Sequence, residues 1–181
     1  MRNILILLIF TLTARTASSQ SQNIYGLSFT RMDGTTQPLS AYQGKKILFI
    51  ILPVTKTADD STYLDTLRAI ADRHADSLVM IGVLSYEDGY FDDSLYSLQP
   101  WFQSMLDSNF VITSGMSTRK SSAYQDPVFA WLTSASQNGH FDYDVAGTDE
   151  KFFISGTGTL YGVFDPSQKL DEAVVEGMLN K

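Results

Sequence analysis

Two uninterrupted apolar runs lie at residues 47–52 and 78–84, and the segment between them follows a different pattern. A short, wholly apolar run bounded by polar or turn residues is typical of a β-strand buried on both faces. Residues 61–76 carry apolar side chains at spacings of three and four, which predicts an amphipathic helix with Thr62 and Asp65 as its capping pair. A strand, a helix and a second strand in this order predict a right-handed parallel crossover.

Shorter patterns on both sides of this unit predict the rest of the fold. Apolar and polar positions alternate before residue 46 around Asp33 and Gly34, a dipeptide that favours a hairpin turn. The remaining predicted elements are a helix from Pro100, a strand at 110–113, an exposed loop at 114–125, a helix from Pro127 to Asn138, a hairpin of strands 151–155 and 159–164, and a terminal helix with Leu170, Val174 and Met178. This order is typical of an α/β sandwich.

The N-terminal segment has the form of a secretory signal peptide, with a positively charged start, a short apolar run and then small polar residues. A membrane-spanning helix needs about 20 apolar residues, and Arg15 interrupts the run before that length. Ala17 and Ser19 fit the residues that precede a cleavage site, so we predict a signal peptide at residues 1–19 and one domain at residues 20–181. We expect an exported chain, periplasmic or extracellular, with no integral membrane segment after cleavage.

Composition indicates a globular chain and excludes several functions. Of the 181 residues, 44% are hydrophobic and 18% are charged, which fits one folded domain with a sizeable core. The formal net charge is −7 and the basic residues are scattered, so nucleic acid is not an expected partner. The chain contains no cysteine, which excludes disulfides, thiol catalysis and thiolate metal sites.

A series of short motifs follows in order along the chain, at residues 23–26, 33–34, 39–45, 126–132 and 151–154. In order and spacing these motifs resemble the glutathione peroxidase-like proteins, the redoxin branch of the thioredoxin-like superfamily. The resemblance runs from residue 23 to residue 179. It implies a thioredoxin-like three-layer sandwich, in which helices flank a central mixed β-sheet, with an N-terminal β-hairpin.

Other residues occupy the catalytic positions of that family. The family's Ser-Lys-Cys-Gly pattern matches residues 55–58, so Thr57 stands at the position of the peroxidatic cysteine. The family's glutamine falls near Asp88, and its Trp-Asn pair falls on Gly147 and Thr148. A thiolate attacks a peroxide because it is anionic near neutral pH and can form a sulfenic acid, and a threonine hydroxyl does neither. We therefore expect a redox-inactive protein that needs no cofactor.

The leading hypothesis is a binding or interaction module whose partner, a protein or a small ligand, meets the position of the family's active site. This edge is expected to consist of three segments, residues 55–61, 86–93 and 147–151. The candidate binding residues on it are Lys56, Thr57, Asp88 and Lys151. Exposed tyrosines beside an acidic loop offer a recognition surface, at Tyr86, Tyr90 and Tyr96.

Two alternatives remain open from the sequence. His140, Asp142 and Asp144 alternate, so in a strand all three would face one way and resemble a divalent metal site. His140 and Asp142, together with Asp88, suggest a member of the thiol-dependent peroxidase family with residual or different enzymatic activity, hydrolytic or metal-assisted. A purely structural role in the cell envelope is the third possibility.

Overall fold

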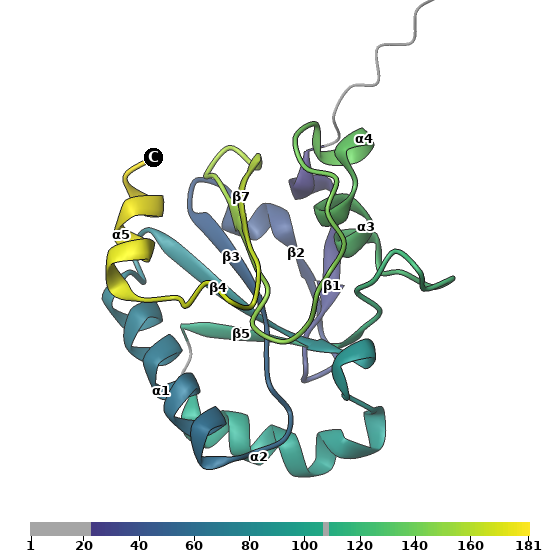
Figure 1. Cartoon of the computed structure of the whole chain (residues 1–181), viewed down its shortest axis with the longest axis vertical. Helices are drawn as coiled ribbons and strands as arrows, with labels where there is room; N and C mark the ends of the chain where they lie inside the picture. The colour runs from purple at the N-terminus through teal and green to yellow at the C-terminus, as the bar shows by residue number, and fades with distance from the viewer. Residues whose placement is uncertain (1–22, 107–108) are drawn as a thin grey trace, which may run out of the picture.

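A computed structural model of the chain describes residues 23–106 and 109–181 (Figure 1). The predicted signal peptide at residues 1–19 lies outside the described residues. The α-helices are α1 (Ala58–Arg73), α2 (Leu95–Met105), α3 (Pro127–Thr133), α4 (Ala135–Asn138) and α5 (Glu172–Leu179). The β-strands are β1 (Ser28–Thr30), β2 (Thr36–Pro38), β3 (Lys46–Ile51), β4 (Leu78–Ser85), β5 (Phe110–Met116), β6 (Lys151–Ile154) and β7 (Leu160–Phe164). Short 3-10 helices are η1 (Ile24–Gly26), η2 (Leu39–Tyr42), η3 (Tyr86–Asp88) and η4 (Asp92–Ser94).

The main sheet has the strand order β5-β4-β3-β6-β7. β3 pairs in parallel with β4, and β4 pairs in parallel with β5, whereas β6 is antiparallel to both β3 and β7. The predicted crossover is confirmed, because α1 connects the parallel strands β3 and β4. The predicted hairpin near the C-terminus is also confirmed, since β6 and β7 pair around a turn at Gly158, where φ is 83°.

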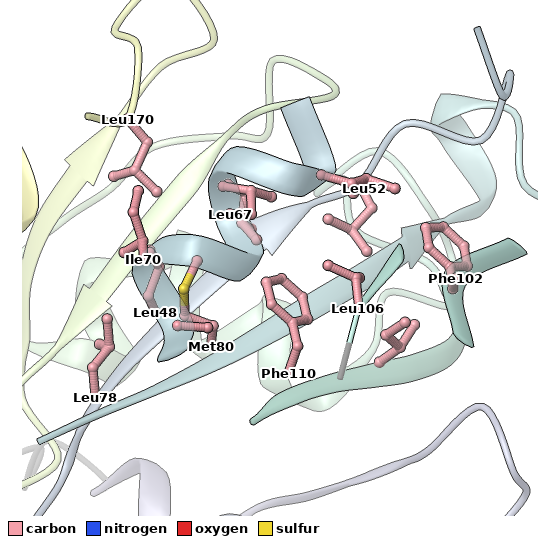
Figure 2. Close-up of a cluster of buried hydrophobic side chains, with 14 of the residues drawn as sticks. Leu48, Leu52, Leu67, Ile70, Leu78, Met80, Phe102, Leu106, Phe110 and Leu170 are labelled. Atoms are coloured by element: carbon pink, nitrogen blue, oxygen red, sulfur yellow. The ribbon is translucent and has the colours of Figure 1, made fainter. Parts of the chain in front are cut away.

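Side chains that alternate along β3 fill two separate cores, one on each face of the sheet. Leu48 and Ile50 pack with side chains from α1, α2 and α5, in the core shown in Figure 2. Phe49 points to the opposite face and packs with residues of α3, including Phe129 and Trp131. Full burial of each such side chain stabilises the fold by about 1.5–3 kcal/mol. The result is three layers, with helices on both faces of a mixed sheet.

The N-terminal hairpin of β1 and β2 is confirmed and lies beside the outer strand β5. The Met32 backbone N–H donates to the Ile112 carbonyl over 2.9 Å, and Arg31 forms an isolated bridge with Thr113. This contact covers part of the free edge of β5, where unpaired backbone groups would otherwise face water. Within the described residues, no helix is both long and apolar enough to cross a membrane.

Two predicted helix starts are wrong, each for a local reason. α1 begins at Ala58 because Thr57 and Asp60 form the capping box, whereas Thr62 lies inside the helix and its hydroxyl donates to the Ala58 carbonyl. α2 begins at Leu95, so Pro100 lies inside this helix and not at its start. A proline within a helix removes one backbone hydrogen bond. Burial of the neighbouring helical side chains, such as Phe102, offsets that loss.

Two further expectations are corrected in the second half of the chain. β5 extends to Met116, so the first part of the expected loop at residues 114–125 belongs to the sheet. The expected single helix from Pro127 to Asn138 is divided at Ser134, whose backbone is extended, into α3 and α4.

Candidate functional site

Three segments meet where β3 and β4 end, and we call this region the carboxyl edge: residues 55–61, 86–93 and 147–151. A Cβ atom on Gly89 would lie 3.7 Å from a methyl group of Val54. A Cβ atom on Gly147 would lie 3.4 Å from the Asp88 carboxylate. The carboxyl ends of neighbouring parallel strands lie at one edge of a sheet, which explains why segments far apart in the sequence assemble here.

Thr57 caps α1 and occupies the first corner of the carboxyl edge, which we call the Thr57 corner (residues 55–61). Its hydroxyl oxygen accepts from the Asp60 N–H over 3.1 Å, and the Asp60 carboxylate accepts from the Thr57 N–H over 2.9 Å. Thr55 also donates to that carboxylate, over 2.6 Å. Partial burial raises the pKa of Asp60, but the hydrogen bonds from Thr55 and Thr57 outweigh this effect and lower the pKa overall. Lys56 is exposed, with φ of 57°.

Asp88 lies at the second corner, and its side chain is only 8% exposed. Its carboxylate accepts from the Ser85 hydroxyl over 2.6 Å and forms an ion pair with Arg119 over 2.9 Å. The adjacent Glu87 carboxylate accepts from the Thr118 N–H over 2.9 Å. Partial burial acts to raise the pKa of Glu87, but the hydrogen bonds that its carboxylate accepts, from the Thr118 backbone above all, together lower the pKa. These contacts fix the end of β4 to the loop after β5.

Arg119 also contributes to this corner, although the sequence predicted an exposed loop at residues 114–125 and did not single out this residue. Its Nη2 pairs with Asp88, and its Nε is buried without a hydrogen-bond partner. Arg119 and Asp88 are 31 positions apart in the sequence, so no local sequence pattern predicts that they form an ion pair. Their contact depends on the parallel pairing of β4 and β5, which brings the two loops together.

Lys151 forms the third corner of the carboxyl edge, the Lys151 corner (residues 147–151), and its side chain is completely buried. The ammonium group lies 3.0 Å from the Asp149 carboxylate and donates to the Gln168 carbonyl over 2.5 Å. The Tyr63 hydroxyl donates to the same Asp149 carboxylate. Burial, followed by the negative charge of Asp149, raises the pKa of Tyr63. Lys151 therefore lies beneath the carboxyl edge and not on its surface.

Glu150 is a second buried ionisable residue at the same corner. One carboxylate oxygen accepts from the Ala146 N–H over 3.3 Å, and the other has no hydrogen-bond partner. Burial raises the pKa of Glu150 to about 7, and the charges of Asp165 and Asp149 act in the same direction. The Ala146 N–H and the Lys151 ammonium group oppose the shift without cancelling it. The protonation of this carboxyl group therefore changes near neutral pH.

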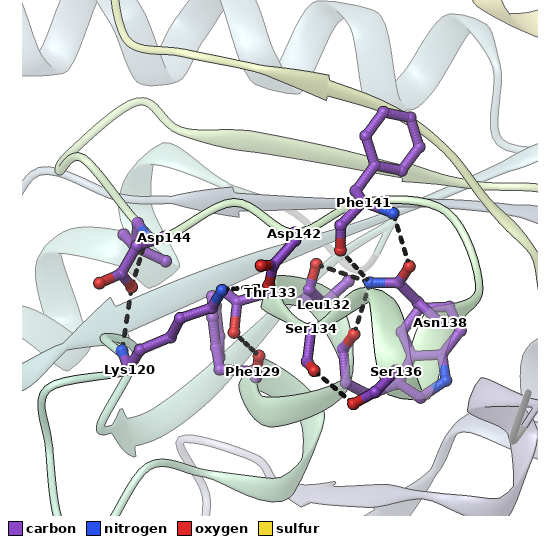
Figure 3. A network of polar contacts seen from close by, with 12 residues as sticks. Lys120, Phe129, Leu132, Thr133, Ser134, Ser136, Asn138, Phe141, Asp142 and Asp144 are labelled. Atoms are coloured by element: carbon purple, nitrogen blue, oxygen red, sulfur yellow. Dashed lines mark hydrogen bonds and ion pairs between the residues drawn. The ribbon is translucent and has the colours of Figure 1, made fainter. Parts of the chain in front are cut away.

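The proposed metal ligands do not share a face of a strand, because the segment after α4 forms no strand (Figure 3). The Asn138 side chain donates to the Phe141 carbonyl and accepts from the His140 N–H, which turns the chain around the amide. Asp142 pairs with the Lys120 ammonium group, and Asp144 accepts from the Lys120 N–H over 2.9 Å. Across residues 23–106 and 109–181, His, Asp and Glu side chains form no group of three that could hold a metal ion.

Several solved structures share this arrangement of sheet and helices. The Trgpx structure in its apo form has a TM-score of 0.66 and 15% identity, and the match covers 90% of this chain and 98% of that chain. The T. cruzi GPX1 structure has a TM-score of 0.61 and 12% identity, covering 88% and 97%. A thiol:disulfide interchange protein of the thioredoxin family from Chlorobium tepidum has a TM-score of 0.58 and 14% identity, covering 91% and 97%. The fold is thioredoxin-like.

The thioredoxin-like fold predicted from the sequence is thus confirmed, with Trgpx, GPX1 and a thioredoxin-family protein among the similar structures. No family model matches the chain, and no curated protein matches it in sequence. The chain carries the thioredoxin-like fold without any cysteine. Thiol chemistry by its own side chains is therefore excluded.

Proposed function

We propose that this chain is an exported, redox-inactive binding module of the thioredoxin-like fold, which binds a protein or small ligand at the carboxyl edge. The observation that carries the proposal is the capping role of Thr57, the residue matched to the peroxidatic cysteine. Its hydroxyl oxygen accepts from the backbone of α1, and no thiol exists elsewhere in the chain to replace it. Export rests on the signal-peptide pattern of residues 1–19.

The surroundings of Thr57 also argue against a different nucleophilic role. A threonine hydroxyl needs an adjacent base to become a nucleophile. The nearest carboxylate is that of Asp60, whose lowered pKa makes it a weak base. It already accepts hydrogen bonds from Thr55 and from the Thr57 backbone. The Thr57 hydroxyl therefore stabilises the start of the helix, and Asp60, the carboxylate beside it, is too weak a base to activate it.

A binding role is favoured because hydrogen bonds and ion pairs fix the side chains that lie under the carboxyl edge. Asp88 is fixed by Ser85 and Arg119, and Lys151 is fixed by Asp149. Residues fixed before association lose less conformational entropy when a partner binds. Lys56, at the exposed tip of the Thr57 corner, is then free to contact a ligand.

Peroxide consumption by the purified chain tests the redox-inactive part of this proposal. We expect no turnover of hydrogen peroxide with dithiothreitol or with a thioredoxin system. Thr57→Ser is the matched control, because it keeps the helix cap but supplies no thiol. Thr57→Cys is expected to gain turnover, which would place the loop in a geometry suited to peroxidase chemistry. Turnover by the wild-type chain that disappears on heat denaturation would contradict the proposal.

A further inference from the structure

Exposed aromatic rings lie beside carboxylates in the segment that joins β4 to α2. Tyr86 is 41% exposed, Phe91 is 63% exposed and Tyr96 is 92% exposed. Asp92 and Asp93 lie between them and are also exposed. We call these five residues the aromatic surface; Tyr86 and Phe91 belong to the middle segment of the carboxyl edge, and Tyr96 lies in the first turn of α2.

Specific contacts hold two members of the aromatic surface, Tyr86 and Asp92, in place. The Tyr86 hydroxyl donates to the Asp92 carboxylate over 2.9 Å, and its ring packs on the buried ring of Tyr90, with centroids 5.5 Å apart. Tyr90 was expected to be exposed, and its burial makes it the support for Tyr86. A Cβ atom on Gly115 of β5 would lie 2.4 Å from the Tyr86 ring, so only glycine allows this approach. Tyr86 and Asp92 are thus preorganised for contact with a partner.

The stretch of sequence that contains the aromatic surface carries charge of one sign. No lysine or arginine occurs between Arg73 and Arg119. The acidic residues of the same stretch are Asp76, Glu87, Asp88, Asp92, Asp93 and Asp107. Arg119, the next cation along the chain, pairs with Asp88, while Glu87 accepts from Thr118. Asp92 and Asp93 therefore remain the outward carboxylates of the aromatic surface.

We propose that the aromatic surface binds a lysine- or arginine-containing segment of a partner protein. Cationic side chains are attracted both to carboxylates and to the faces of aromatic rings. Tyrosine and phenylalanine are enriched in protein interfaces, where they supply contact area with little loss of side-chain entropy. The inference rests on the proposed binding function and adds the chemical class of its partner. An acidic or uncharged partner would not match this combination.

Titration of a fluorescein-labelled peptide of alternating Arg and Ser residues into the full chain tests the inference. Asp92→Asn/Asp93→Asn is expected to weaken the peptide affinity about tenfold, because it removes both carboxylates of the surface, and Phe91→Ala severalfold, because it removes one of the three exposed rings. The matched control is Asp76→Asn/Glu176→Gln. It removes the same net charge from exposed positions outside the carboxyl edge, before β4 and on α5, and is expected to change the affinity less than about twofold.

Three results would overturn the inference: no binding of the Arg-Ser peptide, equal losses in both charge variants, or an unchanged affinity of Phe91→Ala. Equal losses would show a long-range effect of net charge and no defined surface. Binding of a peptide of alternating Glu and Ser residues would be a fourth result against the inference. Peroxide turnover, measured on the same preparation, tests the redox-inactive function separately, so the two failures are distinguishable.

Discussion

The Thr57 corner and the Lys151 corner lie at the same edge of the sheet but are stabilised in opposite ways. At the Thr57 corner, exposed polar groups satisfy one another within a few residues, through the Thr57 and Asp60 capping box. At the Lys151 corner, buried charges depend on distant parts of the chain. Tyr63, on α1, and the Gln168 carbonyl, after β7, both contribute to the Lys151 network.

This difference indicates which part of the carboxyl edge tolerates amino-acid substitution. A residue that only caps a helix can be replaced with a small effect, because water and neighbouring groups compensate at an exposed site. A buried charge that loses its partner remains desolvated, and the free energy of unfolding falls by much more. Thr57 should therefore tolerate substitution, whereas replacement within the charged network around Lys151 should destabilise the fold.

Replacement of Lys151 should give the largest effect. Lys151→Met removes the cation that faces Asp149 and the donor to the Gln168 carbonyl. We expect the free energy of unfolding to fall by about 3 kcal/mol, because removal of one partner leaves a poorly solvated charge. Urea unfolding followed by tryptophan fluorescence measures this change.

Lys169→Met is the matched control for that experiment. Lys169 is exposed near the same loop, so the same chemical change there should alter the free energy of unfolding by less than about 0.5 kcal/mol. Combining Lys151→Met with Asp149→Asn should recover part of the loss, since the unpaired carboxylate is also removed. A loss below about 1 kcal/mol in Lys151→Met would mean that the Lys151 network is not coupled to the fold.

Glu150 gives the same corner a dependence on pH. Its pKa is about 7 in the folded chain, above its ordinary value of 4.5, so the folded state holds the proton more tightly. The resulting stabilisation is complete below the ordinary pKa and is lost as pH rises toward and through 7. We expect this loss to reach about 3 kcal/mol, as follows from the difference between the two pKa values. Urea unfolding at several pH values between 5 and 8 measures the slope.

Glu150→Gln should remove this decline, because a glutamine has no proton to lose in that range. The exposed Glu176→Gln on α5 is the control and should keep the wild-type slope. A Glu150→Gln variant whose stability falls with pH as steeply as that of the wild-type chain would assign the dependence to another group.

The framework of the fold was predictable because its signals are local. The apolar runs at residues 47–52 and 78–84 predict buried strands whatever surrounds them, and both became central strands of the sheet. The start of α1 was misplaced because Thr57 and Thr62 are both followed three residues later by an aspartate. Only the backbone conformation of Thr57 shows which of the two pairs forms the capping box.

The candidate site was predictable in its position but not in its interactions. Three segments were expected at one edge, because the resemblance to the glutathione peroxidase-like proteins implies that their active-site positions meet there. The partners of Asp88 and Lys151 were not expected, since Arg119 and Gln168 come from other loops. Glu150, just before β6, is buried. The sequence does not predict this burial, because glutamate side chains are usually exposed.

The smallest effect is expected at Thr57 itself. Thr57→Ala leaves the Asp60 N–H without its acceptor, and the free energy of unfolding should fall by about 1 kcal/mol. Thr57→Ser retains a hydroxyl oxygen and should stay within about 0.5 kcal/mol of the wild-type chain. Amide hydrogen exchange should localise the change to the first turn of α1, because the contacts of Thr57 remain within that turn. A loss of unfolding free energy as large as that of Lys151→Met, or faster exchange that spreads into β3 and β4, would show that the two corners are stabilised in the same way.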